Sequence, residues 1–188
     1  METRDQYEIE ELTPKMGVFL IKSPIHYDDR GYFMEGFNDS ILKEKGMEFD
    51  FIQYNVSRSK YGTLRGLHFQ KPPFSQAKFV RCLKGEIFDV AVDLRSNSLT
   101  YGKAVSAYLS EENNYALFIP RGFAHGFIVT SKEDAIVLYL VDNIYAPQAE
   151  GGINWADPSL NINWQLKPLH ISKKDTMWPT IEESKIKL

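Results

Sequence analysis

Cysteine is scarce in this chain, because Cys82 is the single cysteine among 188 residues. An intrachain disulfide is therefore excluded, and so is a metal site built from several thiolates. No apolar run approaches the roughly 20 residues that a membrane-spanning helix needs. The first segment, Met1–Lys15, is charged and lacks the apolar stretch of a signal peptide. These absences predict a soluble, cytoplasmic protein without a membrane partner.

Positive charge is not in excess either. The 22 Lys and Arg residues are outnumbered by 25 Asp and Glu, which leaves a net charge of −3. No overall basic field would therefore draw the protein to nucleic acid or to an anionic membrane, and we expect neither as a partner. An anionic ligand would have to be held by cations gathered locally.

Aromatic side chains, in contrast, are plentiful, at 13% of the residues. Together with short runs of alternating polarity they favour β structure over a helical bundle. The length and the 43% of apolar residues suffice for a core, and no repeat, low-complexity tract or linker divides the chain. We predict a single domain over residues 1–188.

Period-two alternation dominates the sequence. In Gly85–Leu94 one face is apolar, whereas the other carries Asp89 and Asp93 and is typical of a lined cavity. Turn signals such as Lys84-Gly85 separate most of the other short runs. Such spacing predicts a sandwich or a barrel. The other predicted strands are Val18–Ile21, Phe51–Ser57, Gly62–Gln70, Phe79–Leu83, Ala104–Leu109, Tyr115–Ile119, Gly126–Thr130 and Ala135–Val141.

One short helix interrupts this pattern. Asp39 or Ser40 can cap it, Ile41–Lys45 forms it, and Gly46 ends it. The tail from Pro158 onward is irregular. Packing onto the sheets is the expected role of the tryptophans near and within it, ahead of a ligand cage; these are Trp155, Trp164 and Trp178.

Two histidine segments, Gly62–Gln70 and Pro120–Phe127, resemble the two short motifs of the cupin superfamily. The resemblance implies an all-β cupin-type double-stranded β-helix, or jelly roll, with a barrel core at about 17–145. A metal-binding cupin has His where this chain has Gln70 and Glu where it has Lys78. An ammonium at a ligand position opposes a divalent cation. We therefore predict no metal and no other cofactor.

The chain as a whole resembles the dTDP-4-dehydrorhamnose 3,5-epimerase family from about Gly17 to Asp175. That family epimerises nucleotide-linked 4-keto-6-deoxy sugars, most typically dTDP-4-dehydro-6-deoxy-D-glucose to dTDP-4-dehydro-L-rhamnose. Six segments in matching order and spacing carry the resemblance: Asp29–Glu35, Leu64–Gln70, Gly85–Arg95, Ile119–Phe127, Trp155–Pro158 and Ser172–Asp175.

The chemistry explains these residue types, because epimerisation beside a ketone needs a base, an oxyanion stabiliser and an acid on the opposite ring face. His68 is the expected base, since the ordinary imidazole pKa lies near working pH. The resemblance implies that Asp175 orients it and that Lys78 holds the enolate oxygen. It also implies that Tyr139 is the acid, provided that nearby cations lower its pKa. Without the resemblance, Tyr139 would be packing and Asp175 a solvated acid or helix cap.

The resemblance also implies residues that bind the nucleotide sugar. Tyr145 matches an aromatic that stacks on the base. His125 either contacts the nucleotide sugar or hydrogen-bonds a residue that does. The segment Arg30–Glu35 can reach a partner subunit's site in this family, which implies a homodimer built by strand exchange. The full set is Arg30, Phe33, Glu35, Gln53, Asn55, Arg65, Lys78, His125, Tyr145, Glu150 and Lys174.

Three positions depart from the family pattern. Tyr54 replaces Asp, Val56 replaces His, and Leu140 stands where Lys is common. We expect them to alter the pocket wall, which leaves open an epimerase acting at one carbon or on another nucleotide sugar. A metal cupin and a non-catalytic sugar-binding cupin are the alternatives of other classes.

Overall fold

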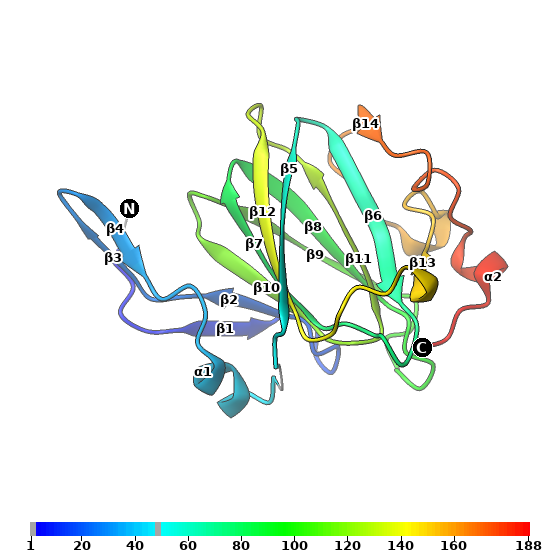
Figure 1. Ribbon diagram of the computed structural model, residues 1–188, viewed down its shortest axis with the longest axis horizontal. Coiled ribbons are helices and arrows are strands. Elements are labelled where there is room, and N and C mark those ends of the chain that lie inside the picture. Colours follow the sequence, from blue (N-terminus) through cyan, green and yellow to red (C-terminus); the bar gives the residue numbers. More distant parts are fainter. Residues whose placement is uncertain (1–2, 48–49) are drawn as a thin grey trace.

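Two β-sheets packed face to face form the body of the molecule (Figure 1). The computed structural model describes residues 3–47 and 50–188. One sheet has the strand order β1-β2-β10-β7-β12-β5, and the other has β13-β6-β11-β8-β9, with β14 paired to β6. This arrangement confirms the predicted all-β jelly roll.

The first sheet contains β1 (Glu8–Glu11), β2 (Phe19–Lys22), β5 (Gln53–Ser59), β7 (Lys78–Lys84), β10 (Tyr115–Ile119) and β12 (Ala135–Val141). The second contains β6 (Thr63–Gln70), β8 (Glu86–Asp93), β9 (Ala104–Ser110), β11 (Phe123–Val129), β13 (Glu150–Gly152) and β14 (His170–Ile171). Each of the nine predicted strands corresponds to one of these within a few residues. The short strands β1, β13 and β14 were not predicted.

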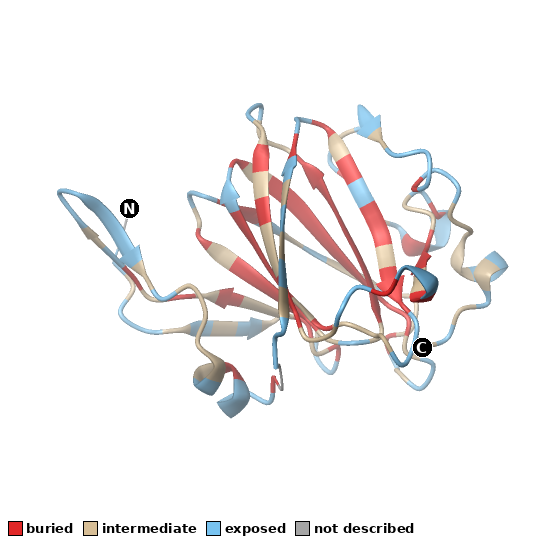
Figure 2. Cartoon of the chain, in the orientation of Figure 1, coloured by how far each residue is buried: buried red, intermediate tan, exposed pale blue. Residues whose placement is uncertain are grey.

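A separate hairpin of β3 (Ile25–Asp28) and β4 (Gly31–Met34) projects away from the body (Figure 1). Its two strands pair with each other, and most of its residues are exposed (Figure 2). Sequence alternation did not reveal it, because each of its strands has only four residues and is mostly exposed.

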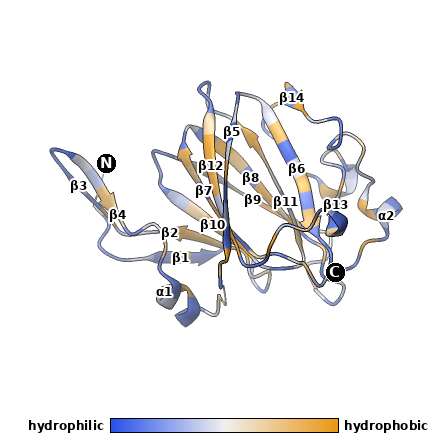
Figure 3. Ribbon diagram, in the orientation of Figure 1, coloured by the Kyte–Doolittle hydropathy of each residue, from blue (hydrophilic) through white to orange (hydrophobic). Residues whose placement is uncertain are grey.

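Three apolar clusters follow from the alternation of side chains (Figure 3). Ile87 and Ala91 of β8 join the cluster between the sheets, whereas Phe88 and Val90 point to the outer face of the second sheet. The irregular tail covers that outer face, and Trp164 packs into it as expected. The third cluster lies on the outer face of the first sheet, where Leu42 of the helix packs.

The predicted helix is α1 (Asp39–Glu44), but its cap is neither Asp39 nor Ser40. Asn38 is the N-cap: it has extended backbone, and its side chain accepts a hydrogen bond from the N–H of Ile41. Gly46 follows the last turn with a left-handed φ of +78°, as its role at the helix end requires. The remaining helical turns are η1 (Pro147–Ala149), η2 (Pro158–Leu160) and α2 (Ile181–Ser184). Within the described residues, no helix is both long and apolar enough to cross a membrane.

Candidate active site

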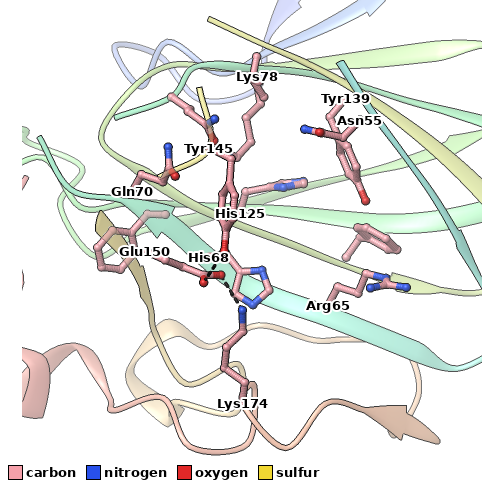
Figure 4. A pocket seen from close by; sticks show the side chains of 14 residues that line it. Asn55, Arg65, His68, Gln70, Lys78, His125, Tyr139, Tyr145, Glu150 and Lys174 are labelled. Carbon is pink, nitrogen blue, oxygen red and sulfur yellow. Dashed lines mark hydrogen bonds and ion pairs between the residues drawn. The ribbon is translucent and has the colours of Figure 1, made fainter. Parts of the chain in front are cut away.

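A cavity of about 360 Å³ opens between the two sheets and is lined by fourteen side chains (Figure 4). The first sheet contributes Asn55, Lys78 and Tyr139, and the second contributes Arg65, His68 and His125 among others. Nine of the predicted site residues line this cavity: Asn55, Arg65, His68, Lys78, His125, Tyr139, Tyr145, Glu150 and Lys174. His68 and Tyr139 therefore stand on opposite walls.

His68 is paired with a carboxylate from the tail. Its Nε2 lies 2.6 Å from Oδ1 of Asp175, which is 107 residues further along the chain. Burial alone would raise the pKa of Asp175, but hydrogen bonds from His68, Ser172 and the backbone of Gly66 outweigh it and hold the pKa below its ordinary value. Because Nε2 is engaged by Asp175, Nδ1 is the nitrogen left to exchange a proton with a ligand.

Lys78 begins β7 and projects into the cavity. Burial lowers the pKa of its ammonium to about 8, against a smaller opposing effect of Asp142. Its Nζ donates to Oε1 of Gln76 at 3.2 Å, and Gln76 in turn donates to the carbonyl of Asn143. This places a largely desolvated cation, still mostly charged at neutral pH, where a ligand oxygen can reach it.

Tyr139 is partly buried, and its hydroxyl lies 2.5 Å from Oγ of Ser57. The expectation that cations lower its pKa is wrong in its net direction. Burial raises the pKa of Tyr139 and outweighs the hydrogen bond from Ser57 and the positive charge of Arg65, which both lower it. The phenol is therefore protonated at neutral pH.

A second histidine–carboxylate pair lies deeper. His125 Nε2 is 2.6 Å from Oδ1 of Asp89, and both side chains are buried. Asp89 belongs to the polar positions of Gly85–Leu94 that predicted a lined cavity, but it was not named as a site residue. Ser57 was not named as a site residue either. It shares a face of β5 with Asn55, so the period-two pattern could have found it.

At the rim, Glu150 connects two predicted binding residues. Its carboxylate accepts hydrogen bonds from the hydroxyl of Tyr145 at 3.1 Å and from Nζ of Lys174 at 2.7 Å. The Glu150 bond raises the pKa of Lys174. Gln53 lies just behind, accepting from the backbone N–H of Tyr145 and donating to Asn55. The rim is thus held by side-chain bonds between segments far apart in the sequence.

Gln70, which replaces the second histidine of a metal cupin, uses its amide on the backbone. It donates to the carbonyls of Phe74 and Ile144 and accepts from the N–H of Ala146 at 2.6 Å. Gln70 thereby fixes the loop that carries Tyr145. Over residues 3–47 and 50–188 there is no cluster of three or more His, Cys, Asp or Glu that could hold a metal ion.

The three departures from the family pattern do not lie in the pocket wall, and that expectation is wrong. Side chains alternate along β5, so that Tyr54 and Val56 point outward and are 65% and 56% exposed, while Asn55 points inward. Leu140, next to Tyr139 on β12, packs into the cluster on the outer face of the same sheet. The period of two places all three on the face away from the ligand cavity.

Arg30, Phe33 and Glu35 are not part of this cavity. They lie on or beside the projecting hairpin: Arg30 bonds Asp28, Glu35 bonds Asn38, and Phe33 is 73% exposed. The hairpin points away from the body of its own chain (Figure 1).

A family model described as dTDP-4-dehydrorhamnose 3,5-epimerase matches residues 13–183. The chain belongs to this family. It is 48% identical to the dTDP-4-dehydrorhamnose 3,5-epimerase of Methanothermobacter thermautotrophicus over 92% of this chain and 94% of that protein.

Solved structures agree. The dTDP-6-deoxy-D-glucose-3,5-epimerase of Legionella pneumophila in complex with dTDP-4-keto-L-rhamnose has a TM-score of 0.90 at 38% identity, covering 97% of this chain and 98% of that chain. A 3'-monoepimerase of Streptomyces bikiniensis in complex with dTDP-quinovose has a TM-score of 0.85 at 33% identity, covering 94% and 89%. The solved structures similar to this chain therefore include one named a 3,5-epimerase and one named a 3'-monoepimerase.

Proposed function

We propose that this protein is an isomerase that converts dTDP-4-dehydro-6-deoxy-D-glucose to dTDP-4-dehydro-L-rhamnose. The observation that carries the proposal is the placement of His68 and Tyr139 on opposite walls of one cavity. Lys78 lines the same cavity from β7, the strand paired with the β12 strand of Tyr139. Inversion beside a ketone requires a base on one ring face and an acid on the other. This cavity offers both.

In the proposed first step, Nδ1 of His68 removes the proton from a carbon next to the ketone. Asp175, 2.6 Å from Nε2, stabilises the imidazolium that results. The ammonium of Lys78 stabilises the negative charge that develops on the ketone oxygen. Because Lys78 is desolvated, this interaction is stronger than it would be in water. No step of this scheme draws on a bound cofactor.

In the second step, the hydroxyl of Tyr139 returns a proton from the opposite wall. A phenol with a raised pKa holds its proton until the enolate forms. The phenolate left behind would be stabilised by the Ser57 hydroxyl at 2.5 Å and by the charge of Arg65. Before the next turnover the His68 imidazolium releases its proton to solvent, and the Tyr139 phenolate takes up a proton from solvent.

For binding, Arg65 and Lys174 supply cations for the diphosphate and Tyr145 supplies a half-exposed ring for stacking on the base. Lys174 would exchange Glu150 for a phosphate oxygen. We further propose a homodimer in which the hairpin of one subunit delivers Arg30, Phe33 and Glu35 to the partner's cavity. Its exposed Phe33 and its direction away from its own body support this. The cytoplasmic location stays a prediction.

The dimer can be tested by mixing two inactive variants, Arg30→Ala and His68→Asn. If the hairpin completes the partner's site, mixed dimers contain one intact site and regain activity. A monomer in sedimentation, or no recovery despite subunit exchange, would contradict strand exchange.

A second candidate, epimerisation at one carbon, is favoured by the 33% identity to the 3'-monoepimerase. Incubation with dTDP-4-dehydro-6-deoxyglucose in deuterated water separates the two. Deuterium at both carbons that flank the ketone supports the 3,5-epimerase, and deuterium at C3 alone supports the monoepimerase. Binding without exchange would indicate a sugar-binding cupin, whereas activity lost to chelators and restored by metal would indicate a metal cupin.

A further inference from the structure

Trp178 differs from the other two tryptophans in the place of its ring. Trp155 and Trp164 belong to the apolar cluster beneath the tail, where the indole N–H of Trp164 donates to the carbonyl of Trp155 at 2.8 Å. The ring of Trp178 lies against His68 instead, with centroids 6.4 Å apart and planes at 72°, an edge-to-face contact. Trp178 therefore touches the proposed base, which general packing of the tail would not require.

The same indole also reaches the carboxylate partner of His68. Nε1 of Trp178 lies 3.4 Å from Oδ1 of Asp175, the oxygen that His68 binds at 2.6 Å. A hydrogen bond of that length is weak. The oxygen is nevertheless contacted from two sides, by Trp178 and by His68, and this restricts its movement.

Space for the ring is provided by a glycine. A Cβ added to Gly152 would overlap the Trp178 ring, and Gly152 lies opposite His68 in the pairing of β13 with β6. The chain beyond the ring is fixed by the N–H of Asn154, which donates to the carbonyl of Pro179 at 2.8 Å. The indole is thus held against the strand neighbour of the base.

We propose that Trp178 is a positioning residue for the His68–Asp175 pair. By confining the carboxylate oxygen and one side of the imidazole, it keeps Nε2 on Asp175 and Nδ1 directed at the cavity. The activity arm of the test rests on the function proposed above, but the contact itself does not.

Three variants test the proposal by kinetics. Trp178→Phe keeps much of the packing and removes the N–H, and Gly152→Ala displaces the ring from the other side. Both should lower kcat for deuterium incorporation by about tenfold, leave KM unchanged, and shift the pH dependence of kcat/KM. Trp164→Phe is the matched control, because it removes an indole hydrogen bond from the same tail. It should lower Tm while leaving kcat and the pH profile at wild-type values.

If Trp178→Phe and Gly152→Ala behave like Trp164→Phe, with lost stability and an unchanged pH profile, the proposal is wrong. Partial rescue of kcat by Trp178→His, which restores a ring N–H, would support it over a packing role.

A second arm needs no substrate. Protonated imidazole quenches indole emission at contact distance, so part of the pH dependence of tryptophan fluorescence should require His68. His68→Asn should remove that part, Trp178→Phe should remove it too, and Trp164→Phe should keep it. A wild-type protein that shows this titration but no exchange would refute the proposed function and leave the contact supported. Fluorescence that does not depend on His68 would overturn the contact.

Discussion

The molecule contains two histidine–carboxylate pairs with the same 2.6 Å separation and different surroundings. The side chain of His68 is 32% exposed and its partner comes from the tail, whereas the side chain of His125 is 7% exposed and its partner lies on the adjacent strand β8. An exposed edge lets an imidazole exchange protons with a ligand and with solvent. Equal geometry with unequal access thus favours the His68 pair over the His125 pair for the proposed proton transfer.

The largest effect should come from the exposed pair. We expect His68→Asn to keep the fold and nucleotide binding but to lose proton exchange by roughly 100- to 10,000-fold, the usual contribution of a general base. His125→Asn should instead lower stability, because it disturbs a hydrogen bond to a buried carboxylate. Deuterium exchange and thermal unfolding, measured on both variants, give the comparison. Near-normal exchange in His68→Asn would refute the base assignment.

The next prediction tests the charge of Lys78 in the cavity. Lys78→Met should lower kcat by roughly 100- to 1,000-fold, as loss of one oxyanion donor does. The same change should stabilise the protein at pH 7, because a pKa lowered from 10.5 to about 8 means that folding costs about 3 kcal/mol while the amine is charged.

The direction of the Lys78 pKa shift sets the pH range over which this stability effect is expected. The cost is present below pH 8 and disappears as pH rises toward 10.5, so the stability advantage of Lys78→Met should shrink over that range. Denaturant titrations at pH 7, 9 and 10 measure it. An advantage that grows with pH would show that Lys78 is not desolvated.

Asp175→Asn should have a smaller effect on exchange than His68→Asn and act on the same step, because the imidazole keeps its nitrogen but loses the charge that stabilises its protonated form. Asp175 also links the exposed pair to acid stability. Its lowered pKa contributes stability that is present above about pH 4 and is lost as pH falls through the folded-state pKa. Asp175→Asn should therefore weaken the pH dependence of unfolding below pH 4, which acid titration followed by circular dichroism would check.

Tyr139→Phe should disturb the fold least. It should change the ratio of the rate of deuterium exchange to the rate of epimerisation. The enolate can still form through His68 and Lys78, but its proton returns mostly to the original face. Recovered substrate should then be deuterated without being inverted, so that exchange outruns epimerisation. Equal ratios in the variant and the wild type would show that Tyr139 only packs.

Sequence alternation predicted β8, although both of its faces are buried. Its polar positions, Asp89 among them, alternate with apolar side chains, and Asp89 binds His125, which lines the cavity. The strands β3, β4 and β13 have only three or four residues each, which is too short for an alternation to stand out, so they were missed.

Site residues followed the same division. His68 is recognisable within its motif, but Asp175 reaches it only through a tail whose path no local pattern encodes, and family resemblance alone supplied the pairing. The period of two along β5, applied by itself, places Tyr54 and Val56 on the outward face, so the expectation from the family pattern was wrong for both.

The separation of 107 residues between His68 and Asp175 also sets an order in time. At about 5 to 20 residues per second, a ribosome adds Asp175 roughly 5 to 20 s after His68. By then every strand from β6 to β13 has been synthesised, and most sheet partners can meet before the tail exists. A chain interrupted in that interval would carry the histidine, the lysine and the tyrosine of the cavity without the carboxylate that binds His68. The His68–Asp175 pair is therefore completed late in synthesis, after the sheets that hold His68.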